Sequence, residues 1–267
     1  MSVNAPETMA AVVSDQLLTG KVCVISGAAT GIGRAAGVLF AQAGAHVVIA
    51  DVSDGQPVVD QISGLGLPRS KAISTDVGDP EQVRRLIEGV SEEFGRLDVI
   101  YANAGTHEWG SAPEVSVDSW ERSLRINLSG QFYLAKYGIP VMEQSGRGAI
   151  ILTASEYGLF GARRSVGYCA AKAGVINLTR ALAVDSASAG IRVNCVVPGP
   201  TATERALEIF ASDPGLEEQQ DRLILLRRNG KPQEVARVAL FLASEGASFM
   251  TGAIVRVDGG ATSWYSV

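Results

Sequence analysis

The segment Ser26-Gly27-Ala28-Ala29-Thr30-Gly31-Ile32-Gly33 follows the apolar run Lys21–Ser26, and a helical pattern begins directly after it. Glycine lets a backbone turn sharply and approach a ligand closely. The following helix would present free N–H groups and the positive end of its dipole to the turn. A strand, a glycine-rich turn and a helix in this order predict a pyrophosphate site for a dinucleotide. An ordinary tight turn is the alternative, because the spacing is G-x-x-x-G-x-G and not the common G-x-G-x-x-G.

Outward from this turn, short apolar runs alternate with longer helical patterns. Several runs are apolar almost throughout, as expected for strands of a parallel sheet that is buried on both faces. Repeated strand–helix–strand units predict an α/β domain with a doubly wound parallel sheet and helices on both faces. The seven predicted strands are Lys21–Ser26, His46–Asp51, Ala72–Thr75, Leu97–Tyr101, Gly148–Ala154, Ile191–Val197 and Ala253–Val257.

Four longer segments between these strands carry helical patterns, and one of them has a clear start signal. Asp79 is a candidate N-cap, with Pro80 at the first helical position. Residues 1–18 are interpreted as a loose N-terminal extension, and residues 19–267 as a single dinucleotide-binding catalytic domain. The predicted helices are Pro80–Phe94, Val117 to about Met142, Ser165–Ala189 and Pro232–Ala243.

The segment Pro200–Arg228 interrupts the alternation and is far longer than the usual connection of about 4–6 residues. It mixes apolar and charged side chains, which favours a short amphipathic helix pair over a binding cleft. We expect a mobile substrate lid here, and a fixed helical insertion is the alternative. The apolar set is Leu207, Ile209, Phe210, Leu223, Ile224 and Leu225, and the charged set is Glu217, Glu218, Asp221, Arg227 and Arg228.

Composition narrows the function classes. The chain has 267 residues and a net charge of −5, which argues against nucleic acid or an anionic membrane as a main partner. No apolar run approaches the roughly 20 residues that cross a bilayer, and residues 1–20 lack the apolar core of a signal peptide. Cys23, Cys169 and Cys195 are not spaced as a metal site, and scattered thiols fit a cytoplasmic protein.

Asp51 ends the second predicted strand, 18 residues beyond Gly33. A carboxylate at this place can accept hydrogen bonds from both adenosine ribose hydroxyls, and it would repel a 2′-phosphate. Neither Thr30 nor Val52 offers the cation that a 2′-phosphate would require. The sequence therefore predicts NAD as the cofactor, with a plain strand-end cap as the alternative for Asp51.

Further motifs fall in a fixed order along the chain, and together they resemble the short-chain dehydrogenase/reductase family over residues 20–260. Ala102 and Ala154 depart from that pattern, because the family often has asparagine and serine there. The resemblance implies a Rossmann-type fold and a homotetramer. The motifs are Asp76-Val77, Asn103-Ala104-Gly105, Asn127, Ser155, Tyr168-Cys169-Ala170-Ala171-Lys172, Pro198-Gly199 and Thr203.

The resemblance also implies a role for each matching residue. Asn127, Ser155, Tyr168 and Lys172 correspond to a catalytic tetrad, in which Asn127 would support a water that links Lys172 to solvent. The remaining matches are expected to bind the cofactor. They are the pyrophosphate loop Gly27, Thr30, Gly31, Ile32 and Gly33; the adenosine side Asp51, Asp76 and Val77; Asn103, Ala104 and Gly105 beside the cofactor; the nicotinamide side Pro198, Gly199 and Thr203; and Tyr168 and Lys172 themselves.

The chemistry of these side chains fits hydride transfer. Tyr168 and Lys172 are four residues apart and share one helix face. The phenol titrates near 10 when unperturbed, and the Lys172 ammonium and an oxidised nicotinamide ring would both lower its pKa. Tyr168 could then act as general acid and base towards a secondary alcohol or ketone, while Ser155 holds the substrate oxygen. A catalytically silent dinucleotide-sensing or scaffold protein is the alternative.

Other residues are weaker candidates. His46 and His107 are the only histidines, which disfavours a histidine-based nucleophilic triad, although His107 could reach the cleft. The Arg163-Arg164 pair hints at an anionic substrate. Trp109, Glu156 and Tyr157 also flank the expected substrate site and are otherwise ordinary loop residues. The tail Ala261–Val267 carries Trp264 and Tyr265, aromatic residues that suit a partner surface.

Overall fold

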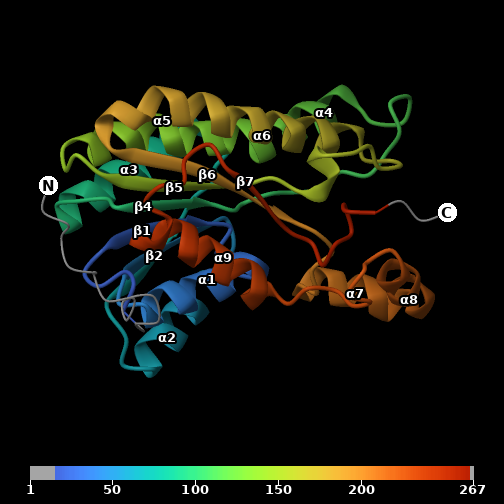
Figure 1. Cartoon of the computed structure of the whole chain (residues 1–267), viewed down its shortest axis with the longest axis horizontal. Coiled ribbons are helices and arrows are strands. Elements are labelled where there is room, and N and C mark those ends of the chain that lie inside the picture. The colour runs from blue at the N-terminus through green and yellow to red at the C-terminus, as the bar shows by residue number, and fades with distance from the viewer. Residues whose placement is uncertain (1–15, 265–267) are drawn as a thin grey trace, which may run out of the picture.

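A parallel sheet of seven strands runs through the centre of the computed structural model, which describes residues 16–264 (Figure 1). The strand order is β3-β2-β1-β4-β5-β6-β7, and every neighbouring pair is parallel. This sheet confirms the predicted fold class. The strands are β1 Val22–Ser26, β2 His46–Asp51, β3 Ser70–Ser74, β4 Val99–Ala102, β5 Gly148–Thr153, β6 Ile191–Pro198 and β7 Ile254–Val257.

The chain reverses its direction of travel across the sheet between β1 and β4, which lie side by side although two strands separate them in sequence. Ligands of open α/β sheets bind beyond the carboxyl ends of strands at such a switch point. The glycine-rich turn follows β1, and Asn103-Ala104-Gly105 follows β4. The topology therefore brings these two predicted motifs to one edge of the sheet.

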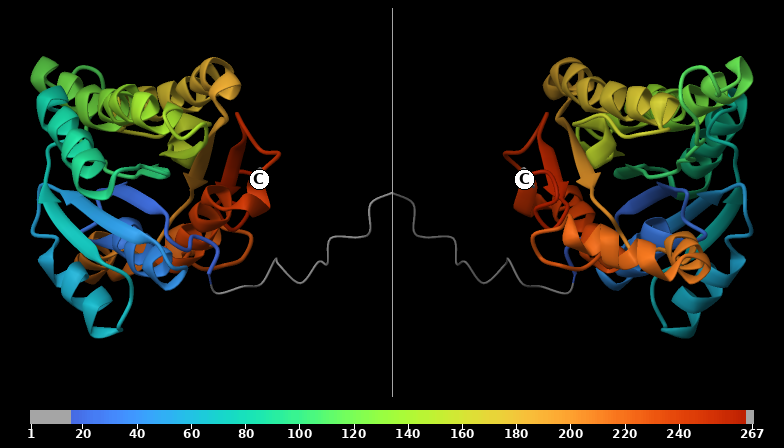
Figure 2. Two further views of the ribbon diagram at one scale, coloured as in Figure 1. Left: turned by 90° about the vertical axis from the view of Figure 1, so that its left-hand side faces the viewer. Right: turned by 90° about the vertical axis from the view of Figure 1, so that its right-hand side faces the viewer.

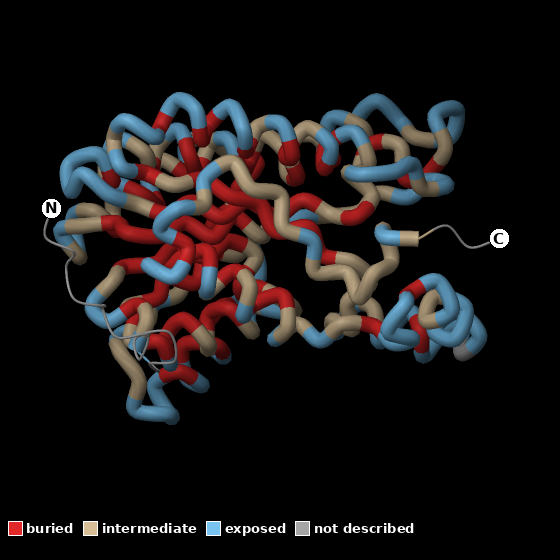
Figure 3. Tube along the Cα trace, viewed as in Figure 1, coloured by how far each residue is buried: buried red, intermediate tan, exposed pale blue. Residues whose placement is uncertain are grey.

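Helices cover both faces of the sheet, as Figures 1 and 2 show. On one face α1 (Gly31–Gln42) and α9 (Pro232–Ala243) pack together, with α2 (Gln56–Gly64) beside α1. On the other face lie α3 (Pro80–Phe94), α4 (Val117–Leu124), α5 (Gly130–Glu143) and α6 (Val166–Ser186). Buried residues form one core on each side, along the strands and the inner sides of the helices (Figure 3).

Local signals set the ends of α3. The Asp79 carboxylate accepts hydrogen bonds from the N–H groups of Glu81 at 2.9 Å and Gln82 at 3.3 Å, which confirms the predicted N-cap. Gly95 ends the helix with a φ of 68° in the left-handed region, where glycine has no steric penalty. The four buried residues of α3 recur every three or four positions and face the sheet.

The predicted continuous helix from Val117 to Met142 was wrong in one respect. A π-helical segment, Arg125–Ser129, separates α4 from α5. Such segments are rare and recur at functional sites, because they turn a side chain away from the regular helical position. Here the Asn127 amide donates to the Ser123 carbonyl at 2.9 Å and to the Thr106 carbonyl at 2.8 Å.

The segment after β6 contains the predicted helix pair, α7 (Glu204–Ser212) and α8 (Pro214–Arg222), which lie together at one end of the molecule (Figure 1). Their expected burial is only partly found. Phe210 and Ile224 are buried, whereas Leu207 and Leu223 stay more than half exposed. Part of the apolar set of this segment therefore faces outward in this structure.

Both ends of the described part of the chain contact the rest of the domain. Residues 1–15 and 265–267, which include Tyr265, lie outside the described residues. Leu18, assigned to the expected extension, is 1% exposed, and its N–H donates to the Ala43 carbonyl at 2.8 Å. At the other end the Trp264 indole N–H donates to the Leu223 carbonyl at 3.1 Å.

Within residues 16–264, no helix combines the length and apolar character needed to cross a membrane.

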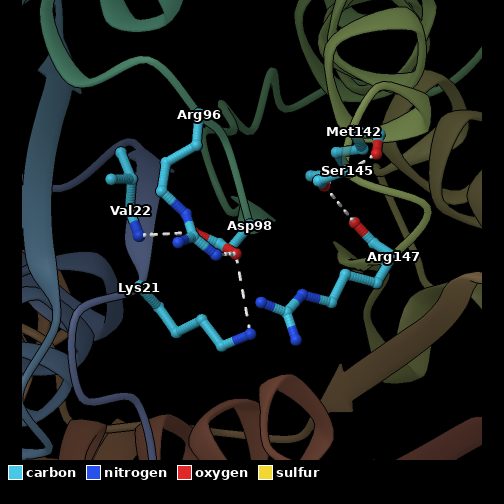
Figure 4. Close-up of polar contacts among 7 residues, drawn as sticks. All are labelled: Lys21, Val22, Arg96, Asp98, Met142, Ser145 and Arg147. Atoms are coloured by element: carbon cyan, nitrogen blue, oxygen red, sulfur yellow. Dashed lines mark hydrogen bonds and ion pairs between the residues drawn. The ribbon is translucent and has the colours of Figure 1, made fainter.

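A buried carboxylate lies at the amino ends of the central strands (Figure 4). Asp98 is 3% exposed and accepts hydrogen bonds from the Val22 N–H at 2.9 Å and from the Arg96 guanidinium, while the Lys21 ammonium lies 3.6 Å away. Burial raises the pKa of Asp98, but Arg96, the Val22 N–H and Lys21 together outweigh it, so the net pKa is lowered. The cluster ties the start of β1 to the start of β4.

Replacing Asp98 by Asn should reduce the free energy of unfolding at pH 7 by roughly 1–3 kcal/mol, because charge-assisted hydrogen bonds are lost. A lowered pKa stabilises the fold fully above the ordinary aspartate pKa of about 3.9 and loses that effect as the pH falls through the lowered value. Urea unfolding at pH 7 and in acid should therefore show a difference that shrinks in acid. Asp185→Asn, on the exposed side of α6, is the control. A difference that stays constant with pH would contradict the assignment.

Candidate active site

A cavity of about 640 Å³ opens at the carboxyl edge of the sheet. This volume lies within the range of about 300–1,000 Å³ that is usual for small-molecule and cofactor sites. The expected site residues that line it are Gly27, Thr30, Gly31, Ile32, Asp51, Asp76, Val77, Asn103, Ala104, Gly105, Ser155, Tyr168, Lys172, Pro198, Gly199 and Thr203. Gly33 and Asn127 lie behind this lining. The residues that the sequence singled out are therefore brought together in one cavity, where they form about half of its lining.

The glycine-rich turn has the close packing that a dinucleotide loop requires. Gly31 begins α1 with a φ of 56°, in the region that favours glycine. A Cβ atom on Gly33 would lie 2.0 Å from the Gly27 carbonyl oxygen, so no larger residue fits there. The Asn103 amide donates to that same carbonyl at 3.0 Å and thereby fastens the end of β4 to the turn.

Asp51 acts as the strand-end cap that was the alternative interpretation of its position, and its expected contact with a ribose stays a prediction. Its carboxylate accepts hydrogen bonds from the Ala29 N–H and the Ser53 N–H, both at 2.9 Å, so it caps the strand end and holds the turn. It also lines the cavity. A carboxylate can accept about four hydrogen bonds, so acceptor capacity remains for a ligand.

Tyr168 and Lys172 lie on the first turns of α6, with Lys172 almost fully buried at 2% exposure. The Lys172 ammonium donates to the Thr153 carbonyl at 2.8 Å and lies 5.5 Å from the centre of the Tyr168 ring. Burial lowers the pKa of Lys172 to about 8. Burial raises the pKa of Tyr168 to about 12, although the Ser155 hydroxyl lowers it. The expected lowering of the phenol pKa by Lys172 is therefore not found among the protein's own groups, because the ammonium is directed to Thr153.

Asn127 is fully buried behind the cavity wall. Its side-chain oxygen accepts the Thr106 N–H at 3.1 Å, and its amide donates to two backbone carbonyls. A Cβ atom on Gly105 would lie 2.8 Å from the Asn127 oxygen and 3.6 Å from the Lys172 nitrogen. Asn127 thus holds the loop that covers Lys172, and its expected support of a water stays a prediction.

His107 reaches the cavity, where it stacks between two aromatic rings. Its ring centre lies 4.4 Å from that of Tyr168 and 3.9 Å from that of Trp109, and its Nε2 lies 2.9 Å from the Ser165 hydroxyl. Burial, and to a smaller extent the charge of Arg205, lowers the pKa of His107 to about 4. A neutral His107 therefore packs against the phenol face at physiological pH.

The Arg163-Arg164 pair does not line the cavity. Both side chains are exposed, and Arg164 forms an ion pair with Glu114 at 2.8 Å. The arginines that line the cavity are instead Arg122 on α4 and Arg205 at the start of α7, and the sequence interpretation missed both. The available signal for Arg205 was its place two residues after Thr203, which was itself expected to lie in the site.

Glu204 was also missed, and it makes a contact that spans the cavity mouth. Its carboxylate accepts a hydrogen bond from the Gly31 N–H at 2.8 Å and lies 3.8 Å from the Arg34 guanidinium. The first turn of α7 thus rests on the N-terminus of α1. Only the folded chain reveals this contact, because the two residues are far apart in sequence. Among residues 16–264, no cluster of three or more His, Cys, Asp or Glu side chains suits a metal ion.

Known proteins resemble the chain over nearly its full length. Residues 27–262 match the family model described as enoyl-(acyl carrier protein) reductase. A meso-2,3-butanediol dehydrogenase from Serratia marcescens is 40% identical, and a cyclohexanol dehydrogenase from an Acinetobacter species is 39% identical; each match covers 91% of this chain and 95% of the relative.

Solved structures agree with these relatives. A short-chain type dehydrogenase/reductase from Mycobacterium marinum superimposes with a TM-score of 0.86 at 36% identity, over 93% of this chain and 98% of that chain. The fold, the order of the motifs and the sequence identity therefore all indicate the same family. The chain belongs to the short-chain dehydrogenase/reductase family and is an oxidoreductase of that family.

Proposed function

We propose that this protein transfers a hydride between NAD(H) and a secondary alcohol or ketone, with Tyr168 as general acid and base. The observation that carries the proposal is the meeting of Ser155, Tyr168 and buried Lys172 in the same cavity as the glycine-rich turn and Asp51. A silent dinucleotide sensor would not need these three side chains together. The alcohol-oxidising relatives support the same choice.

The residues present fit a dinucleotide. The positive end of α1 and its N–H groups face the cavity, and they already hold the carboxylate of Glu204 as they would hold a phosphate. Asp51, beyond β2, suits the ribose of the adenosine half. When bound, the nicotinamide cofactor supplies the hydride acceptor or donor and, in its oxidised form, a positive charge.

The protein's own side chains would handle the proton and the substrate position. In alcohol oxidation Tyr168 takes the hydroxyl proton while the hydride leaves the carbinol carbon, and in ketone reduction it returns that proton. Ser155 holds the reacting oxygen by a hydrogen bond. The raised pKa of Tyr168 must fall for the oxidation, so positive charge at this end of the cavity has a direct effect on the rate.

We further propose that Pro200–Arg228 acts as a lid over this cavity. Thr203, Arg205 and Ile209 from this segment line the cavity, and Glu204 contacts the dinucleotide turn. Closure of such a segment would exclude water from the hydride path. A homotetramer remains part of the proposal because the family resemblance implies it, and a cytoplasmic location remains part of it because of the scattered thiols.

Replacing Tyr168 by Phe should abolish turnover but leave NADH binding nearly unchanged, because the ring still packs against His107 while the proton carrier is lost. Steady-state rates on an accepted alcohol and fluorescence titration with NADH measure the two effects. Tyr137→Phe, on α5 outside the cavity lining, is the matched control. Retention of a tenth of the activity by the Tyr168 variant would rule out its assigned role.

NADH should bind more tightly than NADPH by about 1–3 kcal/mol, because Asp51 would meet the 2′-phosphate with like charge. Dissociation constants for both cofactors test this directly. The double substitution Asp51→Asn with Val52→Arg should narrow the gap, whereas Asp54→Asn, on the same loop, should not. Equal or tighter binding of NADPH by the unaltered protein would contradict the proposed NAD specificity.

Hydrogen exchange should detect the lid. Amides of residues 200–228 should exchange faster than those of β1 without cofactor, and should slow when NADH and a substrate are added. The strand amides provide the internal reference in the same sample. If residues 200–228 are as protected without ligands as with them, and as slow as β1, the segment is a fixed insertion.

A further inference from the structure

Glu156 is a buried acidic side chain for which the proposed proton transfer has no use. It is 8% exposed, lines the cavity and directly follows Ser155 in a short 3₁₀ turn, Glu156–Gly158. Within residues 16–264, no side chain or backbone group forms a hydrogen bond or ion pair with its carboxyl; burial and the charge of Asp258 are the influences on it. Its carboxyl oxygens are not fully enclosed by protein, so they are open to a ligand group in the cavity.

Asp258, the acidic neighbour of Glu156, has its own partners. Its carboxylate accepts hydrogen bonds from the Gly260 N–H at 3.0 Å and the Thr262 N–H at 3.1 Å, and these bonds help to keep its pKa low. Burial, and then the charge of Asp258, raises the pKa of Glu156 to about 7. Near neutral pH the Glu156 carboxyl therefore exists in both forms and can accept or donate a hydrogen bond.

The charges around Glu156 favour a neutral hydroxyl as its partner. An anionic substrate group would be repelled by Asp258 and by ionised Glu156. An ammonium group would share the cavity with Lys172 and Arg205 and would need Glu156 fully ionised. A hydroxyl meets neither difficulty, because it can both donate to the carboxylate and accept from the carboxylic acid.

We propose that Glu156 is a specificity-determining residue that binds a second hydroxyl of the substrate, one or two carbons from the reacting carbon. The inference rests on the proposed function, in which Ser155 holds the reacting oxygen. Ser155 and Glu156 both line the cavity, so one small molecule in it can contact both side chains through two of its oxygens. The substrate class is therefore a diol or the corresponding hydroxyketone.

The test compares matched alcohols, cyclohexanol and the cis and trans isomers of cyclohexane-1,2-diol, with NAD as oxidant. Wild-type protein should prefer at least one diol isomer by tenfold or more in kcat/KM. Glu156→Leu should lower that preference at least tenfold through loss of diol activity, with cyclohexanol activity within threefold of wild type. Glu156→Gln, which still hydrogen-bonds, should keep part of the preference. Unchanged diol preference in Glu156→Leu would overturn the inference while leaving the proposed function intact.

A binding titration makes the result independent of turnover. Dissociation constants of the same diols and of cyclohexanol from the protein–NADH complex should show the same loss of diol preference in Glu156→Leu. If wild-type protein oxidises none of the alcohols, the proposed function fails on these probes, and this titration alone decides the role of Glu156. Equal affinity of the wild-type complex for every diol and for cyclohexanol would overturn the inference.

The controls separate a binding defect from a folding defect. Glu208→Leu, an exposed carboxylate on α7 outside the cavity lining, should leave the diol preference unchanged. Thermal unfolding midpoints of all variants identify any that fail to fold, and Glu156→Gln then carries the comparison. A 2-aminocyclohexanol that is preferred over both diols, with the preference lost in Glu156→Leu, would replace the hydroxyl by an ammonium group and overturn the proposal.

Discussion

The hydrogen bond from the Asn103 amide to the Gly27 carbonyl, 3.0 Å long, joins the two strand ends between which the sheet changes direction. It lies beneath the N-terminus of α1, where Gly33 leaves no space for a side chain. The Ser26 hydroxyl strengthens this junction, because it accepts hydrogen bonds from the Asn103 N–H at 3.1 Å and the Ala104 N–H at 3.2 Å. Together with the pairing of β1 and β4, these contacts hold the glycine turn and the loop after β4 at the edge of the sheet where the cavity opens.

A second set of buried hydrogen bonds positions the helix that carries Tyr168. The Thr153 carbonyl, at the end of β5, accepts hydrogen bonds from the Lys172 ammonium at 2.8 Å and the Gln131 amide at 2.9 Å. These bonds fix α5 and α6 against the sheet at the depth where Tyr168 enters the cavity. Burial disfavours the charged ammonium and lowers the pKa of Lys172 to about 8, even though the Thr153 carbonyl accepts a hydrogen bond from it. The same bond directs the ammonium to the Thr153 carbonyl, 5.5 Å from the centre of the Tyr168 ring.

The sequence predicted the features that depend on local rules. Apolar strands, the Asp79 cap and the spacing of Tyr168 and Lys172 follow from periodicity and side-chain chemistry over a few residues. The π-helical segment at Arg125–Ser129 was missed, because it is set by bonds from Asn127 to the distant Thr106. Arg164 was assigned to the wrong surface for a similar reason, since its pairing with Glu114 appears only in the folded chain. The sequence interpretation therefore failed where contacts between distant segments determine the position of a residue.

Two glutamates of the cavity, Glu204 and Glu156, lie in different electrostatic environments. Glu204 rests on the positive end of α1, an environment that favours negative charge, and it forms a bond that a phosphate could form in its place. Glu156 lies at the other end, where burial favours its neutral form. A phosphate at Gly31 would have to displace the Glu204 carboxylate and would therefore act on α7 as well. That N–H group cannot fully serve both acceptors at once, so a phosphate bound at Gly31 would compete with Glu204 for this contact.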